Sequence, residues 1–256
     1  AATDTSIATN AAFYRPWVQS IVATYGRADQ GGVRWWNLDN EPGIWHSTHR
    51  DVVKQGVTHT DLLASSIAAA TMLKSVDPSA LTLGPSEDGW TRYIVSGRDS
   101  QLGNWSATYD GLWALPWYLK EMRLQEQRTG QRLLDYLDLN YYPQAAGVYG
   151  AACSKATQAL RLRTVRSLWD AGYVDESWIS TTGVSSVNLI GRMRDWVATH
   201  YRGTRLAITE YNFGALNHIN GALAQADVLG VFGREGVDLA TLWAPPESWA
   251  GDTSLF

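Results

Sequence analysis

The stretch 33-VRWWNLDNEPGIW-45 decides how the rest of the sequence is interpreted. It begins as an apolar, aromatic run of strand character and then changes abruptly to Asp39, Asn40, Glu41 and Pro42. A carboxylate followed by proline at this point lies at the carboxyl end of the predicted strand. In barrels of alternating strands and helices, catalytic residues gather at that end. Glu41 is therefore a candidate catalytic carboxylate that needs a partner elsewhere in the chain.

Composition excludes several classes of protein. The 256 residues are enough for one large domain, and the formal net charge of −4 gives no reason to expect a nucleic-acid partner. Cys153 is the only cysteine, which rules out an intrachain disulfide and a thiolate metal cluster. No apolar run approaches the roughly 18 residues of a membrane span, and no signal peptide opens the sequence. The 13 Trp and 12 Tyr residues suit stacking on sugar rings, although we expect most of them in the core.

Helical and strand patterns alternate along the chain from Arg15 onward. Helices are predicted for residues 15–25, 60–76 (capped by Thr60 or Asp61), 111–129, 187–200 and 221–234, and strands begin near Val33, Leu81, Leu133, Arg205 and Val237. This alternation is typical of an α/β fold with parallel strands. The long excursion 144–185 contains a basic helical piece at 156–169, and we interpret it as a loop built out over a site.

The residues that follow each strand favour a barrel over an open nucleotide-binding sheet. No glycine-rich phosphate-binding turn follows any predicted strand. Polar and aromatic residues follow strand after strand instead, which favours a TIM-type (β/α)8 barrel with a ligand cleft at its carboxyl face. Five strands are recognisable where this fold needs eight. We therefore expect residues 1–256 to form a single, incomplete barrel domain whose opening strands are missing, with open sheet edges.

Glu210 is the candidate partner of Glu41, because it ends the strand that begins at Arg205 and lies on the same predicted face of the sheet. Two such carboxylates suit hydrolysis of a glycosidic bond, which needs a proton donor and a second carboxylate on the other side of the sugar. Aromatic residues and a neighbouring negative charge raise the pKa of the donor. Trp35, Trp36 and Trp45 flank Glu41 and provide that setting. The alternative is that both glutamates are surface or ion-paired carboxylates.

Two short motifs connect the chain to a known group of enzymes. Asn-Glu-Pro at 40–42 and Thr-Glu-Tyr-Asn at 209–212 resemble the pattern of the large clan of retaining barrel glycosidases. The segments 38–51, 160–179 and 208–236 are similar to glycoside hydrolase family 44, and the similarity runs from about Arg15 to Trp243. The resemblance implies a (β/α)8 barrel of which about strands 4 to 8 are present. The first strands, and a β-sandwich that family members build from both chain ends, are then missing.

The resemblance also implies an activity and roles for residues. Family 44 comprises retaining endo-β-1,4-glucanases that act on cellulose-type chains and often on xyloglucan or xylan. Glu41 then takes the acid/base role and Glu210 the nucleophile role. Further substrate-binding candidates are Asn40, Trp45, Glu87, Trp90, Asn140, Tyr142, Tyr211 and Trp243. The family pattern has a histidine where this chain has Asn140, and Ser86 and Asp88 depart from the pattern around Glu87.

Two other functions are compatible with the same sequence features. A xyloglucan- or mannan-directed glycosidase is the alternative among enzymes, and a non-catalytic glucan-binding barrel remnant is the alternative from another class. The expected partner is a β-1,4-glucan polysaccharide, with no nucleic acid and no membrane, and the family resemblance implies an extracellular location. We expect the activity to require no cofactor. The family allows a structural calcium, for which the sequence identifies no ligands.

The histidines and the arginines of the basic helical piece are interpreted as structural residues, not as metal-binding or nucleic-acid-binding residues. His46, His49 and His59 lack a convincing third ligand, so no metal site is predicted. His218 is expected to order the loop before the last helix. The arginines of the basic helical piece are expected on a solvated face or in ion pairs with Asp175 and Glu176; they are Arg161, Arg163 and Arg166.

Overall fold

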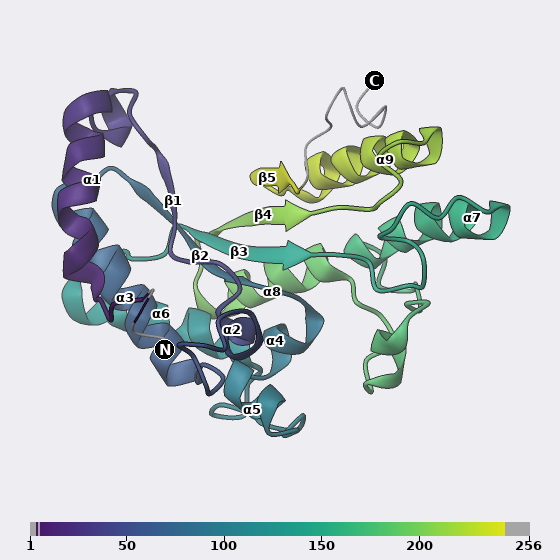
Figure 1. Ribbon diagram of the computed structural model, residues 1–256, viewed down its shortest axis with the longest axis horizontal. Helices are drawn as coiled ribbons and strands as arrows, with labels where there is room; N and C mark the ends of the chain where they lie inside the picture. The colour runs from purple at the N-terminus through teal and green to yellow at the C-terminus, as the bar shows by residue number, and fades with distance from the viewer. Residues whose placement is uncertain (1–3, 5, 244–256) are drawn as a thin grey trace. The chain divides into compact units, whose positions relative to one another are not determined.

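The computed structural model describes residue 4 and residues 6–243 of the chain (Figure 1). The α-helices are α1 (Ala11–Tyr25), α2 (Trp45–Thr48), α3 (His59–Val76), α4 (Trp90–Ile94), α5 (Gly97–Gln101), α6 (Ala114–Thr129), α7 (Lys155–Thr164), α8 (Leu189–His200) and α9 (Ile219–Glu235). The strands are β1 (Trp35–Asn37), β2 (Leu81–Glu87), β3 (Tyr136–Tyr141), β4 (Arg205–Tyr211) and β5 (Leu239–Leu242). Short 3-10 helices are η2 (Ala28–Gln30), η3 (Pro42–Ile44), η4 (Val165–Leu168) and η5 (Trp178–Thr181). Within the described range, no helix combines the length and apolar character needed to cross a bilayer.

The helix boundaries follow from capping and turn chemistry. α3 begins one residue earlier than its predicted start because Thr58 is the N-cap, and its side chain accepts a hydrogen bond from the Asp61 amide. The expectation that Thr60 or Asp61 caps this helix is therefore wrong. α6 begins after the predicted residue 111, since Asp110 and Gly111 both have positive φ in a turn that precedes it.

The strands run parallel, as the alternation of helix and strand predicts. β1 pairs with β2 in the register Trp35 to Leu81, and β4 pairs with β5 in the register Ala207 to Leu239. The strands follow one another in the sheet in chain order, β1-β2-β3-β4-β5. β2 continues to Glu87, and its register with β3 shifts between Pro85 and Glu87. This shift is the main departure from a regular ladder near Glu41.

Compactness divides the chain into two units. Unit 1 comprises Ala1–Leu139 with Trp196–Arg205, and unit 2 comprises Asn140–Asp195 with Leu206–Phe256. Glu41 belongs to unit 1 and Glu210 to unit 2. That residues 1–256 act as a single domain stays a prediction.

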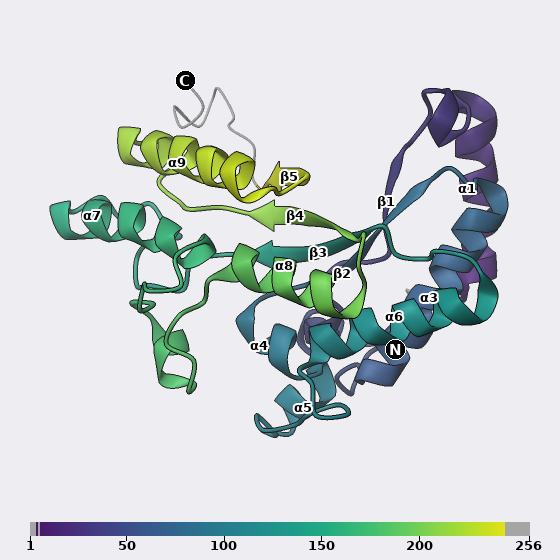
Figure 2. The same cartoon turned by 180° about the vertical axis from the view of Figure 1, so that it is seen from behind.

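Unit 1 is built around helices that cover β1 and β2. α1 lies along α3, as both ribbon views show (Figures 1 and 2). Val18 of α1 and Leu73 of α3 are buried together, with Trp36 of β1 packed against them. A buried ion pair joins Lys74 of α3 to Asp135, with 2.7 Å between Nζ and Oδ2. Because a charge this far from water needs a partner, the pair fixes α3 against the segment that enters β3.

Unit 2 is held together by a buried arginine on α7. Arg161 is fully buried, which contradicts the expectation of a solvated face or an ion pair with Asp175 or Glu176. Its guanidinium donates to the Asn220 amide oxygen at 2.6 Å and to the carbonyls of Val148 and Phe213 at 3.0 and 2.8 Å. Further bonds reach the carbonyls of Gly147, Gly150 and Ala152.

The other two arginines of α7 and η4 are exposed and ion-paired. Arg163 pairs with Glu176 at 2.9 Å, as predicted. Arg166 is exposed, as the solvated-face alternative predicts, and its ion-pair partner is Asp170 at 2.7 Å and not Asp175 or Glu176. Asp170 is one helical turn further along the chain and is therefore the nearer carboxylate.

Candidate active site

Glu41 occupies a tight turn four residues after the end of β1, in unit 1. It is the N-cap of η3 and has φ 49° and ψ 48°, the left-handed conformation that residues other than glycine rarely adopt. Its backbone N–H donates to the Ser86 carbonyl at 2.9 Å, and its own carbonyl accepts from the Ile44 N–H at 3.1 Å. Such a conformation costs of order 1–3 kcal/mol and persists where the surroundings fix it, often at a functional site.

Two further carboxylates lie beside this turn. Glu87, at the end of β2, is only 3% exposed, and its Oε2 accepts from the Gly43 N–H at 3.0 Å. Burial raises the pKa of Glu87 to about 8, and the charges of Asp88 and Glu41 act in the same direction, against Arg92 and the Gly43 N–H. Burial likewise raises the pKa of Asp88 to about 6, although its ion pair with Arg92 at 3.2 Å opposes this.

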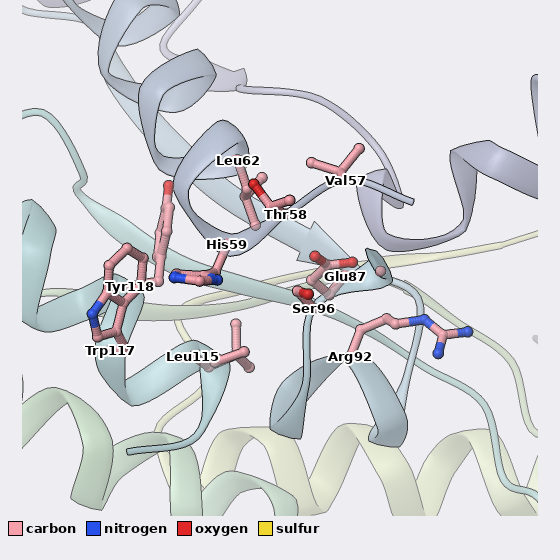
Figure 3. A pocket seen from close by; sticks show the side chains of 12 residues that line it. Val57, Thr58, His59, Leu62, Glu87, Arg92, Ser96, Leu115, Trp117 and Tyr118 are labelled. Carbon is pink, nitrogen blue, oxygen red and sulfur yellow. The ribbon is translucent and has the colours of Figure 1, made fainter. Parts of the chain in front are cut away.

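A cavity of about 10 Å³ borders Glu87 (Figure 3). Figure 3 shows Glu87 beside Ser96, with Thr58 across from it, while the Arg92 guanidinium points away from the aromatic end of the cavity. At that end the His59 ring contacts Trp117, with 4.7 Å between the ring centroids. Burial lowers the pKa of His59, so this imidazole is neutral at pH 7.

Glu210 is the next-to-last residue of β4, in unit 2. The Tyr142 hydroxyl donates to Glu210 Oε1 at 2.6 Å, a short bond of the kind that a carboxylate acceptor makes. Tyr149 packs its ring edge-on against Tyr142, with 5.1 Å between centroids. Asn212 donates from Nδ2 to the carbonyl of Trp243 at 2.8 Å, which ties the ends of β4 and β5 together. A tyrosine and a strand end therefore orient Glu210.

The sequence that carries Glu41 and Glu210 matches a known protein family. The family described as glycoside hydrolase family 44 matches residues 1–145, more than half of the 256 residues. The chain belongs to glycoside hydrolase family 44.

Three relatives show the extent of the similarity. Endoglucanase A of Paenibacillus lautus is 39% identical to the family 44 chain over 236 residues, which cover 88% of this chain and 33% of the relative. The crystal structure of CelM2, a bifunctional glucanase-xylanase protein from a metagenome library, is 45% identical with a TM-score of 0.91, over 96% of this chain and 48% of CelM2. A xyloglucanase of Paenibacillus polymyxa is 32% identical with a TM-score of 0.83, over 91% of this chain and 47% of the relative.

The family 44 chain thus spans about half the length of these solved relatives, and a third of the curated one. The parallel α/β fold and the solved structures that it matches, with TM-scores from 0.80 to 0.91, identify it as part of a TIM-type barrel. The ordinal number of each strand in the barrel stays a prediction.

The substrate-binding candidates of unit 1 separate into exposed and buried residues. Asn40 is exposed, and its carbonyl accepts from the half-buried Trp45 indole N–H at 2.8 Å, so these two belong to the Glu41 turn. Trp90 is 5% exposed and packs against Tyr93 and Trp113, and Glu87 is buried as well. Burial of Trp90 favours a packing role over stacking on a sugar.

The candidates of unit 2 separate in the same way. Tyr142 is half-buried and Trp243 is 54% exposed, so both present ring surface at the ends of β3 and β5. Asn140 is fully buried. Tyr211 is buried against Phe232, and its hydroxyl accepts from Gln225 at 2.8 Å, which favours a packing role for this ring too.

The tryptophans expected to flank Glu41 have other contacts. The Trp35 indole donates to the Tyr136 hydroxyl at 3.3 Å, and Trp36 packs edge-on against Trp17 of α1. Strand alternation sends these two neighbours to opposite faces of β1, which explains why the pair does not surround one carboxylate. Trp45 alone of the three has a contact with the Glu41 turn among those the structure gives.

A polar network under the Glu41 turn is absent from the sequence-based prediction. The Ser86 hydroxyl lies within hydrogen-bond reach of Asn37 Oδ1, at 2.7 Å, and of Asp138. Asn37 Nδ2 donates to Asp138 at 3.2 Å. The signal in the sequence is a polar residue within each of three neighbouring strands, β1, β2 and β3.

Metal binding gains no support from the side chains that the structure describes. Among residues 4 and 6–243, no group of three or more His, Cys, Asp or Glu residues could hold a metal ion. His218 instead caps α9 by accepting from the Asn220 N–H at 3.0 Å, which confirms its predicted role in ordering the loop. That the protein requires no cofactor stays a prediction.

Proposed function

We propose that this chain carries the catalytic pair of a retaining endo-β-1,4-glucanase that cleaves internal bonds of cellulose-type glucans. The observation that carries the proposal is the left-handed Glu41, fixed by backbone hydrogen bonds after a strand in a chain of family 44. A rigid, preorganised carboxylate at a strand end is what proton transfer to a bound substrate requires.

In the proposed mechanism, Glu41 is the acid/base and Glu210 is the nucleophile. Glu41 protonates the oxygen of the leaving sugar while a Glu210 oxygen attacks the anomeric carbon, which breaks the glycosidic bond and forms a glycosyl ester. Glu41 then takes a proton from water, which attacks the ester and releases Glu210. The Tyr142 hydroxyl holds Glu210 in its attacking orientation.

Asn40 and the exposed aromatic rings supply substrate contacts in this proposal. Asn40 lies next to Glu41 in the turn and hydrogen-bonds a sugar hydroxyl. Trp45, Tyr142 and Trp243 present rings on which sugars stack. The substrate is a polysaccharide, and we place the enzyme outside the cell because such a polymer does not enter it. Xyloglucan remains the alternative substrate, supported by the relative named as a xyloglucanase.

A substrate panel tests the proposed activity. The protein is incubated with carboxymethylcellulose, xyloglucan, xylan and mannan, and both reducing ends and solution viscosity are measured. We expect reducing ends from carboxymethylcellulose together with an early fall in viscosity, because internal cleavage shortens chains faster than it releases small sugars. Retention on cellulose without new reducing ends would indicate a non-catalytic glucan-binding remnant instead.

Replacing Tyr142 by phenylalanine should weaken catalysis through Glu210. A hydrogen bond to a charged group contributes about 1.5–3 kcal/mol, so we expect kcat/KM on carboxymethylcellulose to fall about 10- to 100-fold in Tyr142→Phe. The matched control is Tyr149→Phe, since Tyr149 packs against Tyr142 by its ring and the structure gives no bond from its hydroxyl to Glu210. Equal activity of Tyr142→Phe and wild type would remove Tyr142 from the mechanism.

A further inference from the structure

We propose that Glu87 is a positioning residue, a proposal that rests on the acid/base role proposed for Glu41. The buried Glu87 carboxyl group accepts a hydrogen bond from the Gly43 N–H and so fixes the turn 40–44. The fixed turn then holds the Glu41 side chain in place. Glu87 touches neither substrate nor reacting atoms in this proposal. It acts through the backbone two residues after Glu41.

Two consecutive residues of β2 hold two residues of the turn. The Ser86 carbonyl accepts from the Glu41 N–H at 2.9 Å, and the Glu87 carboxyl accepts from the Gly43 N–H at 3.0 Å. Ser86 has a positive φ of 55°, and the register of β2 shifts between Pro85 and Glu87. This irregularity lets a backbone carbonyl and the next side chain serve the same turn, which a regular strand with alternating faces does not allow.

The contact is too close for any residue but glycine at position 43. A Cβ atom there would lie 2.6 Å from Glu87 Oε2 and 2.6 Å from Arg92 Cγ. On the other side, a Cβ at Gly97 would lie 2.4 Å from the Gly43 carbonyl oxygen. The turn is therefore enclosed by β2, α4 and α5, and the Glu87 carboxyl forms part of the wall.

The carboxyl group is suited to accept a hydrogen bond while uncharged. It is almost completely buried, and its pKa of about 8 keeps it mainly protonated at neutral pH. The charged and titratable groups around it are Asp88, Arg92, Glu41, the Tyr118 hydroxyl and the neutral His59 across the cavity. A neutral carboxyl fixes the turn without placing another negative charge beside Glu41, so an amide of the same shape should replace it.

The test compares Glu87→Gln with Glu87→Leu in the protein. Glutamine keeps an acceptor oxygen and leucine removes it at similar volume. We expect Glu87→Leu to lower kcat on carboxymethylcellulose about 10- to 100-fold with KM within about twofold of wild type, and Glu87→Gln to retain kcat within about threefold at pH 6. Equal kcat in wild type and Glu87→Leu would overturn the proposal. A raised KM with unchanged kcat would also overturn it, because Glu87 would then contact substrate.

A second measurement does not need an active enzyme. Hydrogen exchange of the peptide 40–46 should be equally slow in wild type and Glu87→Gln and at least about tenfold faster in Glu87→Leu. If Glu87→Leu does not fold, the exchange rates of wild type and Glu87→Gln still test the proposal. Faster exchange of this peptide in Glu87→Gln would contradict the proposal that a neutral Glu87 carboxyl group accepts the Gly43 N–H. The two proposals can fail separately. If the exchange rates are as expected but the wild-type protein hydrolyses no substrate, the function proposed for Glu41 is refuted and the hydrogen bond between Gly43 and Glu87 is not.

The pH dependence of stability provides a control on the charge state. The folded-state pKa of Glu87 is raised from 4.5 to about 8, so the stability that its neutral form contributes is complete below about pH 4.5 and is lost as pH rises to about 8. Glu87→Gln lacks this loss, while Asp88 titrates in both proteins. The Tm of wild type relative to Glu87→Gln should therefore fall by at least about 5 °C between pH 5 and pH 8. A constant difference would show that Glu87 is already ionised at pH 5.

Discussion

Glu210→Gln is expected to lower kcat on carboxymethylcellulose by at least about 10³-fold while binding of the polysaccharide changes little. The glutamine amide is nearly isosteric with the carboxylate, and its oxygen still accepts a hydrogen bond from the Tyr142 hydroxyl. That oxygen is nevertheless a poor nucleophile toward the anomeric carbon. The loss should therefore lie in kcat, because the ester intermediate no longer forms. Initial rates of reducing-end release and a cellulose pull-down measure the two quantities.

Glu176→Gln is the matched control for that variant. Glu176 is an exposed glutamate of unit 2 whose carboxylate pairs with Arg163 and accepts from the Tyr173 hydroxyl. An exposed ion pair contributes at most about 1 kcal/mol, so we expect this variant to keep wild-type activity. Hydrolysis that survives in Glu210→Gln would refute the nucleophile role and leave Glu210 as a carboxylate held by Tyr142.

Glu41→Gly should lose activity in a way that an external anion restores. General acid–base catalysis contributes about 10²- to 10⁴-fold, and we expect a loss of that size on glucan substrates, where the leaving sugar needs a proton. An aryl β-cellobioside with an acidic phenol should lose less in its first step, because that phenolate leaves unprotonated. Sodium azide should then increase turnover, since azide attacks the glycosyl ester without a general base.

The product of the azide reaction identifies both the role of Glu41 and the stereochemistry. Two displacements give a β-glycosyl azide, whereas a single displacement gives the α-anomer, and proton NMR distinguishes them. Glu121→Gly on α6, in the same unit, serves as the control and should show no response to azide. An α-glycosyl azide, or the absence of rescue in Glu41→Gly, would contradict a retaining mechanism with Glu41 as acid/base.

The parallel α/β fold was open to prediction because its signals are local. Hydrophobic periodicity marks α1, α3, α6, α8 and α9, and the change from apolar to polar residues marks the strand ends. The short helices α4 and α5 lie where the sequence predicts none, since five residues carry too little periodic pattern. From Leu81, where a strand is predicted to begin, β2 continues through Pro85 and Ser86 to Glu87, although these two residues are poor strand formers that tertiary contacts keep in the sheet.

The candidate carboxylates were visible in the sequence, but their surroundings were not. Glu41 and Glu210 follow apolar runs, and such a boundary is a local pattern. The burial of Glu87 depends on Gly43, 44 residues earlier in the chain, and the burial of Arg161 depends on Asn220, 59 residues later. A basic residue on a short helix is usually solvated, so only the fold shows that Arg161 binds backbone carbonyls instead.

The left-handed backbone of Glu41 sets residue 41 apart in any directed-evolution experiment on this protein. Glycine and asparagine adopt this conformation more readily than glutamate, so a library sorted only for heat resistance should accumulate them there. Each such variant gains thermal stability but loses the carboxyl group of the proposed proton donor. Selection for thermal tolerance therefore has to include turnover at every round, or to keep codon 41 constant.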